Sequence, residues 1–186
     1  MDVSRTRALR GPNMWSRHTT IEAVVHCQDA ERSLERLPGF EPRLRQLFPT
    51  IGELRADASL AQVLEQATLA LQAQAGCPVT LSQTHVTPEA GTYQIVVEYS
   101  EEDVGRLAFE QAQKLVLAAL NPDSGDGAFD ADAVLAQLRE LDEDIRLGPS
   151  TGSIVNAAQA RGIPFRRLTQ GSLVQFGWGS KQRRIW

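Results

Sequence analysis

The most constraining feature of this sequence is a strand pattern that leads directly into a long amphipathic helix. Residues 92–100 read TYQIVVEYS, a run rich in the β-branched and aromatic residues that strands favour. Residues 101–120 carry apolar side chains at helical spacing, and Asn121–Pro122 ends the pattern. We expect Ser100 to cap this helix, with Asp103 three residues on as an imperfect capping box. A strand joined so closely to a helix of this length favours an α+β domain.

The other segments predict a small mixed or antiparallel sheet with several packed helices. Residues 3–10 and 20–27 have strand character and are expected to meet through a turn at Gly11–Asn13. The run NPDSGDG at 121–127 is typical of a loop. Further helices are predicted at residues 41–48, 58–75 and 130–145.

Composition bounds the class of protein. The chain has 186 residues, 42% of them hydrophobic, and no apolar run approaches the 18 residues of a membrane span. The basic N-terminus lacks the apolar core of a secretory signal. Two cysteines, Cys27 and Cys77, are too few for a disulfide framework. We therefore expect a cytoplasmic protein without a membrane partner.

Charge divides the chain unevenly. Every acidic residue except Asp2 lies between residues 18 and 160, whereas residues 161–186 contain five arginines, one lysine and no acid. This division suggests two units of different origin, although charges can also cluster simply on solvated faces. A break at LGPST, beginning at Leu147, marks the expected boundary.

The segment after the break predicts one short helix and several short strands. GPSTGS at 148–153 lacks the pattern of a phosphate-binding loop, so Ser150 or Thr151 is expected to cap the helix. The basic run at 180–184 lies among strand-like residues, which argues against a nucleic-acid partner. The strands are expected within PFRRL, LVQFGW and RRIW.

The helix at 58–75 has the spacing of a metal site without its ligands. Asp57 or Ser59 is its expected N-cap, and Gln62, Glu65 and Gln66 stand at i, i+3 and i+4 on one face. Histidines in place of the glutamines would give HxxEH, the arrangement of zinc hydrolases. Neutral amides are poor zinc ligands. The three histidines of the chain form no HxxxH pair, so we predict no metal site.

Three blocks of this sequence resemble the cyanophycin synthetase family. They are LRGPNMWS at 9–16, the strand and helix at 92–108, and the segment 146–185, which contains LGPST and QFGWGSKQRRI. The resemblance implies that residues 1–146 are the N-terminal domain of such an enzyme. Residues 147–186 would be the opening helix and strands of an incomplete ATP-grasp domain, with the rest of that domain and a Mur-ligase-like domain beyond.

The resemblance also implies a function. The family comprises bacterial ligases that build cyanophycin, a poly-aspartate chain carrying arginine on its side-chain carboxylates, from Asp and Arg. ATP and Mg are expected for the full-length enzyme, with no cofactor in this chain. Its implied partners are the polymer or a primer, the missing domains, and other copies of itself in a homo-oligomer. The chain alone is expected to lack a complete active site.

Some members of the family carry a zinc-peptidase-like site that clips the polymer into primers. The ligand positions of that site would fall here at Gln62, Gln66 and Ala70, with Glu65 as the remaining acid. Three of the four groups are therefore absent, and the site is interpreted as degenerate. A metallohydrolase that trims cyanophycin stays open as a less favoured alternative.

The role that the resemblance implies for this domain is to hold the polymer. Cyanophycin presents guanidinium groups and carboxylates, so a receptor needs both signs of charge. These side chains could also be ordinary solvated residues, and the domain could be an oligomerisation module without polymer affinity. The candidate polymer-binding residues are Arg7, Arg10, Arg17, Glu98, Glu101, Glu102 and Asp103.

Overall fold

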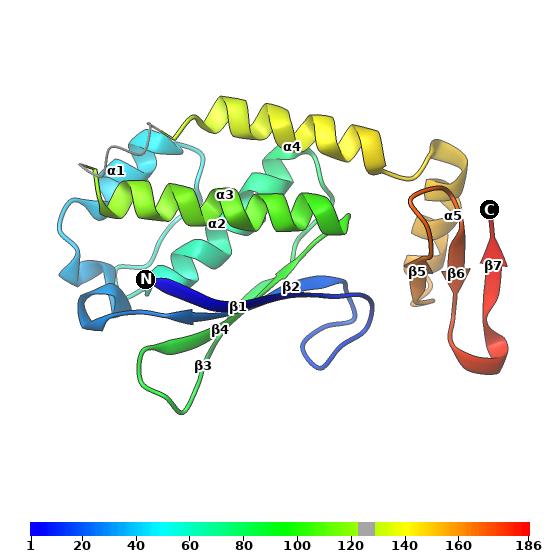
Figure 1. Cartoon of the computed structure of the whole chain (residues 1–186), viewed down its shortest axis with the longest axis horizontal. Coiled ribbons are helices and arrows are strands. Elements are labelled where there is room, and N and C mark those ends of the chain that lie inside the picture. The colour runs from blue at the N-terminus through cyan, green and yellow to red at the C-terminus, as the bar shows by residue number, and fades with distance from the viewer. Residues whose placement is uncertain (123–128) are drawn as a thin grey trace.

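The computed structural model describes residues 1–122 and 129–186, and these form two antiparallel sheets (Figure 1). The larger sheet has the strand order β1-β2-β4-β3, and the smaller sheet has the order β5-β6-β7. With the helices below, this confirms the α+β class. The strands are β1 Asp2–Leu9, β2 Thr20–His26, β3 Ser82–Val86, β4 Thr92–Glu98, β5 Phe165–Arg167, β6 Val174–Phe176 and β7 Arg183–Ile185.

Helices cover one face of the larger sheet (Figure 1). Helices α2 and α3 pack directly on the strands, α1 packs against α3, and α4 packs against α2 and α3. The α-helices are α1 Phe40–Leu47, α2 Leu60–Ala75, α3 Glu102–Leu120, α4 Ala131–Ile145 and α5 Pro149–Gln159; three short 3-10 helices are η1 Asp29–Arg32, η2 Leu34–Arg36 and η3 Gly179–Lys181.

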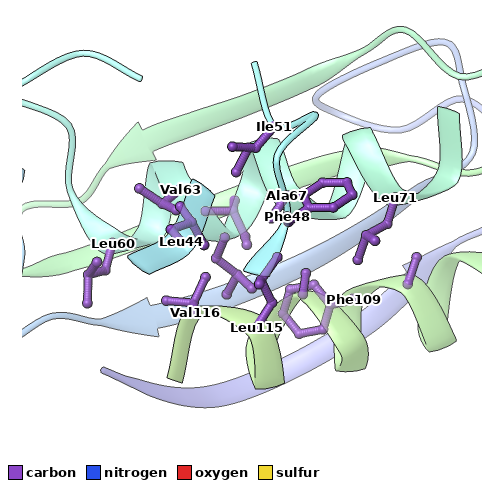
Figure 2. Close-up of a cluster of buried hydrophobic side chains, with 14 of the residues drawn as sticks. Leu44, Phe48, Ile51, Leu60, Val63, Ala67, Leu71, Phe109, Leu115 and Val116 are labelled. Atoms are coloured by element: carbon purple, nitrogen blue, oxygen red, sulfur yellow. The ribbon is translucent and has the colours of Figure 1, made fainter. Parts of the chain in front are cut away.

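The core lies between the larger sheet and its helices. Alternate residues of β2, Ile21, Ala23 and Val25, face the helices and are at most 1% exposed, as the two-residue period of a strand requires. Figure 2 shows the apolar side chains of α2 and α3 meeting Leu44 and Phe48. This cluster ends with α4, so residues 147–186 contribute nothing to it.

A glycine lets α3 approach the end of β4 closely. Gly105 lies in the first turns of α3, and a Cβ there would lie 2.6 Å from the Cβ of Tyr99 and 3.5 Å from Ile21. Real carbon atoms do not approach within 2.6 Å, so any side chain at position 105 would push α3 away from the sheet.

Two predicted helix starts are wrong in detail. Helix α3 has Glu101, not Ser100, as its N-cap residue, and that residue makes no side-chain capping hydrogen bond. Helix α5 is preceded by Gly148, and Pro149 occupies its first turn. Proline is preorganised for that position, so the helix begins before Ser150 and Thr151, and neither hydroxyl acts as the N-cap.

Other differences concern segments with weak local signals. The chain between β1 and β2 is a ten-residue loop, residues 10–19, rather than a tight turn at 11–13. Strand β3 was not expected, because SQTHV is largely polar. The loop predicted at 121–127 falls mostly outside the described residues. Within those residues, no helix is long and apolar enough to span a membrane.

Candidate functional site

The helix with metal-site spacing, α2, uses its first glutamine for capping. Ser59 is the N-cap: its Oγ accepts a hydrogen bond from the Gln62 backbone N–H at 3.3 Å. The Gln62 Oε1 in turn accepts from the Ser59 backbone N–H at 2.8 Å. This reciprocal capping box satisfies two of the backbone donors that a helix start leaves free. The side chain at the first degenerate position therefore stabilises the helix.

Glu65, the acid of the predicted degenerate site, is buried at the helix–sheet interface. Only 7% of it is exposed, and the hydroxyl of Thr84 on β3 donates a hydrogen bond to its Oε2. Gln66 and Ala70 are partly exposed on the same helix. Glu65 thus joins α2 to the strand that the sequence did not predict.

The residues at these positions do not fit a zinc ion. Zinc requires imidazole, thiolate or carboxylate ligands, whereas these positions hold two amides and a methyl group, and the oxygen of one amide is already bonded within the capping box. No group of three or more His, Cys, Asp or Glu side chains in residues 1–122 and 129–186 is placed to hold a metal. No catalytic step through a metal follows from this arrangement.

A buried carboxylate lies on the face of the larger sheet opposite the helices. Glu22 on β2 is 1% exposed, and its nearest cation is Arg7, directly across on β1. The Trp15 indole donates to Glu22 Oε1 at 3.3 Å, and the Gln94 amide donates to the same oxygen. Burial raises the pKa of Glu22, but the hydrogen bond and charge of Arg7 outweigh it and leave this pKa below its ordinary value.

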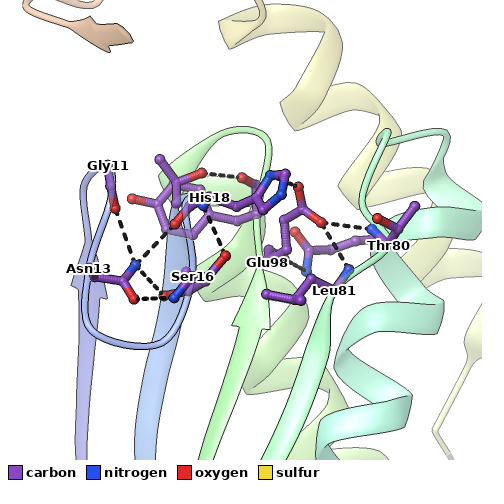
Figure 3. Close-up of polar contacts among 11 residues, drawn as sticks. Gly11, Asn13, Ser16, His18, Thr80, Leu81 and Glu98 are labelled. Atoms are coloured by element: carbon purple, nitrogen blue, oxygen red, sulfur yellow. Dashed lines mark hydrogen bonds and ion pairs between the residues drawn. The ribbon is translucent and has the colours of Figure 1, made fainter. Parts of the chain in front are cut away.

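Trp15 belongs to the loop 10–19, which folds over this sheet face. Its ring stacks on His85 of β3 with centroids 4.6 Å apart. The Asn13 side chain organises the loop from within: its Oδ1 accepts from the backbone of Trp15 and Ser16, and its Nδ2 donates to the carbonyls of Gly11 and His18 (Figure 3). The loop therefore has a defined conformation.

Glu98, one of the candidate polymer-binding residues, is occupied within the fold. It is 8% exposed, and its Oε2 accepts from the backbone N–H groups of Thr80 at 2.8 Å and Leu81 at 2.9 Å (Figure 3). Its Oε1 lies 2.9 Å from His18 Nδ1. The carboxylate thereby ties β4 to the segment before β3 and to the loop 10–19.

A further group of charged residues lies where β1 ends and α3 begins. Arg10 donates to both oxygens of Glu102, at 2.5 and 3.2 Å, and Arg106 donates to the same carboxylate. The hydrogen bond from Arg10, helped by Arg106, lowers the pKa of Glu102 despite partial burial. Arg17, in the loop 10–19, and Asp103, in the first turn of α3, are exposed and form no ion pair with a described residue.

The ion-pair partner of Glu101 lies in residues 147–186, which form the second unit of the chain. Arg167 of β5 reaches Glu101 Oε2 at 3.1 Å, and both side chains are about four-fifths buried, at 18% and 20% exposed. Burial raises the pKa of Glu101, and Arg167 acts in the opposite direction. The carboxylate thus contacts residues 147–186.

The fold is an α+β domain followed by a small second unit. The buried acidic side chains of the larger domain mostly form contacts within that domain. Residues 52–121 match the family described as cyanophycin synthase-like N-terminal domain. The chain is also 32% identical over 205 residues to cyanophycin synthetase of Geminocystis herdmanii and 33% identical over 203 residues to that of Synechocystis sp.. These alignments cover 100% of this chain and 23% of each relative. The chain is thus similar along its whole length to one part of the cyanophycin synthetases.

Several residues of these networks were not singled out by the sequence, among them Glu22, Trp15 and Arg167. A glutamate inside the apolar strand TIEAVVHC was the available signal for Glu22, because a charged residue in such a strand requires a partner. Trp15 and Arg167 carried no comparable local signal, because their contacts join segments far apart in the chain.

Proposed function

We propose that this chain is the N-terminal part of an ATP-dependent ligase that builds cyanophycin, and that it holds the polymer without cutting it. The similarity to cyanophycin synthetases along the whole chain supports the first half of this proposal. The arrangement on α2 supports the second half: Gln62 is committed to the helix cap, and neither it nor its neighbours offer a zinc ligand set. The division at residues 146 and 147, and the ATP and Mg of the intact enzyme, stay part of the proposal.

The surface best suited to the polymer is the mixed-charge end of the domain, defined here as Arg10, Arg17, Glu102, Asp103 and Arg106. A polymer that presents guanidinium groups and carboxylates requires both signs of charge on its receptor. Arg7 and Glu98 are less suitable, because each is bonded within the sheet network. Glu101 is less suitable because Arg167 occupies it.

Binding at this end is expected to be weak per contact and to depend on salt. Each exposed ion pair contributes roughly 0–1 kcal/mol, so useful affinity requires several repeats of the polymer to bind at once. Screening shortens electrostatic reach to about 3 Å at 1 M salt. High salt should therefore remove most of the affinity.

The test is a titration of the chain with soluble cyanophycin segments by calorimetry or anisotropy. The double variant Arg17→Ala with Asp103→Ala removes one exposed charge of each sign, and should weaken binding about tenfold if the sites act multivalently. The matched control is Arg55→Ala with Asp57→Ala, an exposed pair in the loop before α2. This control removes the same charges elsewhere and should bind as the parent does.

The outcomes separate the competing functions. No binding of the parent chain at low salt would favour an oligomerisation module and reject the proposal. Equal loss in the two double variants would reject this surface but retain polymer binding. Shortened polymer after incubation with zinc-reloaded protein, seen by gel electrophoresis, would establish a hydrolase. It would overturn the interpretation that α2 carries no zinc site.

A further inference from the structure

The second unit, residues 147–186, has its own small core. Val155 and Ala158 of α5 and Val174 of β6 are buried but lie outside the main hydrophobic cluster. Strands β5, β6 and β7 pair only with one another among the described strands. The two units therefore share neither a sheet nor a core, and other contacts must fix their relative orientation.

Arg167 makes the principal polar contact between them. Its Nη1 donates to Glu101 Oε2 at 3.1 Å and to the carbonyl oxygen of Ile145, the last residue of α4. Among the described residues, this is the one ion pair that joins residues 147–186 to the rest of the chain. The guanidinium thus bridges the residue before α3 and the carboxyl end of α4.

The position suits a cation for two physical reasons. The C-terminal end of a helix carries partial negative charge, so a guanidinium at the Ile145 carbonyl is favoured by α4. The paired carboxylate of Glu101 supplies a full negative charge at the same place. Because the pair is largely buried, solvent and salt screen it less than a surface ion pair.

Arg167 is also held rigidly on its own side. Its Nε donates to the Gly171 carbonyl at 2.9 Å, and its Nη2 donates to the carbonyl of Gln170. Together with the contacts to Glu101 and Ile145, these bonds engage all three guanidinium nitrogens. Arg167 therefore connects the β5–β6 loop to the larger domain.

An aromatic ring of the second unit also approaches the larger domain. A Cβ built on Gly11 would lie 3.3 Å from Cζ2 of Trp178, so the indole rests against that glycine in the loop 10–19. Trp178 remains 45% exposed. The ring is partly exposed, whereas two of the four hydrogen bonds of Arg167 cross to the larger domain.

We propose that Arg167 is a clamp that holds the second unit in one orientation against the larger domain, and that its release lets the unit turn about residues 146–148. Those three residues join α4 to α5, and Gly148 directly precedes α5. The inference rests on contacts within this chain and stands independently of polymer binding. Its consequence is that the orientation of everything after residue 148 depends on one side chain.

The test measures the distance distribution between two spin labels by pulsed electron resonance. Cysteines replace Glu110 on α3 and Asn156 on α5, both exposed, whereas the native Cys27 and Cys77 are each 5% exposed and react slowly. The chain without introduced cysteines measures background labelling. The labelled parent should give one narrow distribution.

Arg167→Ala should broaden this distribution about twofold or more, because a three-residue linker then permits many orientations. Arg166→Ala is the matched control: it removes the neighbouring arginine, which is exposed and points to the opposite face of β5. Its distribution should equal that of the parent.

Three results would overturn the clamp. They are a broad distribution in the parent, an unchanged distribution in Arg167→Ala, or equal broadening in Arg166→Ala. Circular dichroism of each variant should show the parent helix content, since Arg167 lies outside the main core. Broadening accompanied by lost helix content would also reject the clamp, because it would report unfolding.

Discussion

Replacement of Glu22 by glutamine should destabilise the larger domain by about 1–2 kcal/mol at neutral pH. A hydrogen bond to a charged group contributes about 1.5–3 kcal/mol, and the change removes the negative charge that faces Arg7. The loss falls toward the low end because the Arg7 side chain is 48% exposed and can return to water. The new amide oxygen can still accept the hydrogen bonds of Trp15 and Gln94.

The same change should alter the pH dependence of stability in a defined direction. The pKa of Glu22 lies below its ordinary value in the folded protein, because Arg7 outweighs the effect of burial. A carboxyl group of this kind contributes stability that is fully present above its unfolded pKa, about 4.3 for glutamate, and that is lost as the pH falls through the folded pKa. The difference between parent and Glu22→Gln should therefore be largest at neutral pH and should close below about pH 4.

Urea unfolding followed by tryptophan fluorescence measures this difference, since Trp15 contacts Glu22 directly. Glu53→Gln is the control, because Glu53 is exposed and forms no ion pair with a described residue. A Glu22→Gln variant within about 0.3 kcal/mol of that control would refute the assigned role of the ion pair. A difference that widens on acidification would refute the sign of the pKa argument.

Two further substitutions test the packing and capping of the helices. Gly105→Ala should lower the stability by about 1 kcal/mol or more, because the new Cβ would lie 2.6 Å from Tyr99 and this clash outweighs a helix-propensity gain of similar size. The control is Gly152→Ala, where the nearest contact of a new Cβ is an ordinary 3.6 Å. Thermal melts should show that Gly152→Ala raises the stability. Gln62→Ala should cost about 0.5–1 kcal/mol through loss of the capping box, whereas Gln66→Ala on the same helix should stay near the parent in urea melts.

The sequence predicted those elements whose signals are local. Alternating or periodic apolar residues located both central strands and all of the long helices, because burial of one face imposes a period on the sequence. The comparisons confirm the family resemblance, which rested on three blocks of sequence, and the sheets and helices confirm the α+β class. Strand β3 was missed because its stability comes from pairing with β4 and from Thr84 meeting Glu65, not from apolar side chains of its own.

The roles of individual charges were less predictable, because they depend on register and on long-range contacts. Arg7 is a basic residue near other basic residues in the sequence, but the register of β1 places it opposite Glu22. Glu98 belongs to an acidic run, yet the fold directs it to the backbone of Thr80 and Leu81. Whether a charged residue binds a ligand or stabilises the fold can be assigned only when its neighbours in space are known.

The spacing on α2 shows why a motif needs its surroundings. Residues at i, i+3 and i+4 share one helix face whatever their roles. On α2 the three residues at these positions have different roles. Gln62 serves the cap, which requires an acceptor three residues after Ser59. Glu65 lies one turn further along, where β3 supplies the hydroxyl of Thr84, and Gln66 is partly exposed to water. Capping and packing can therefore produce the spacing of a metal-binding helix without metal ligands at positions 62 and 66.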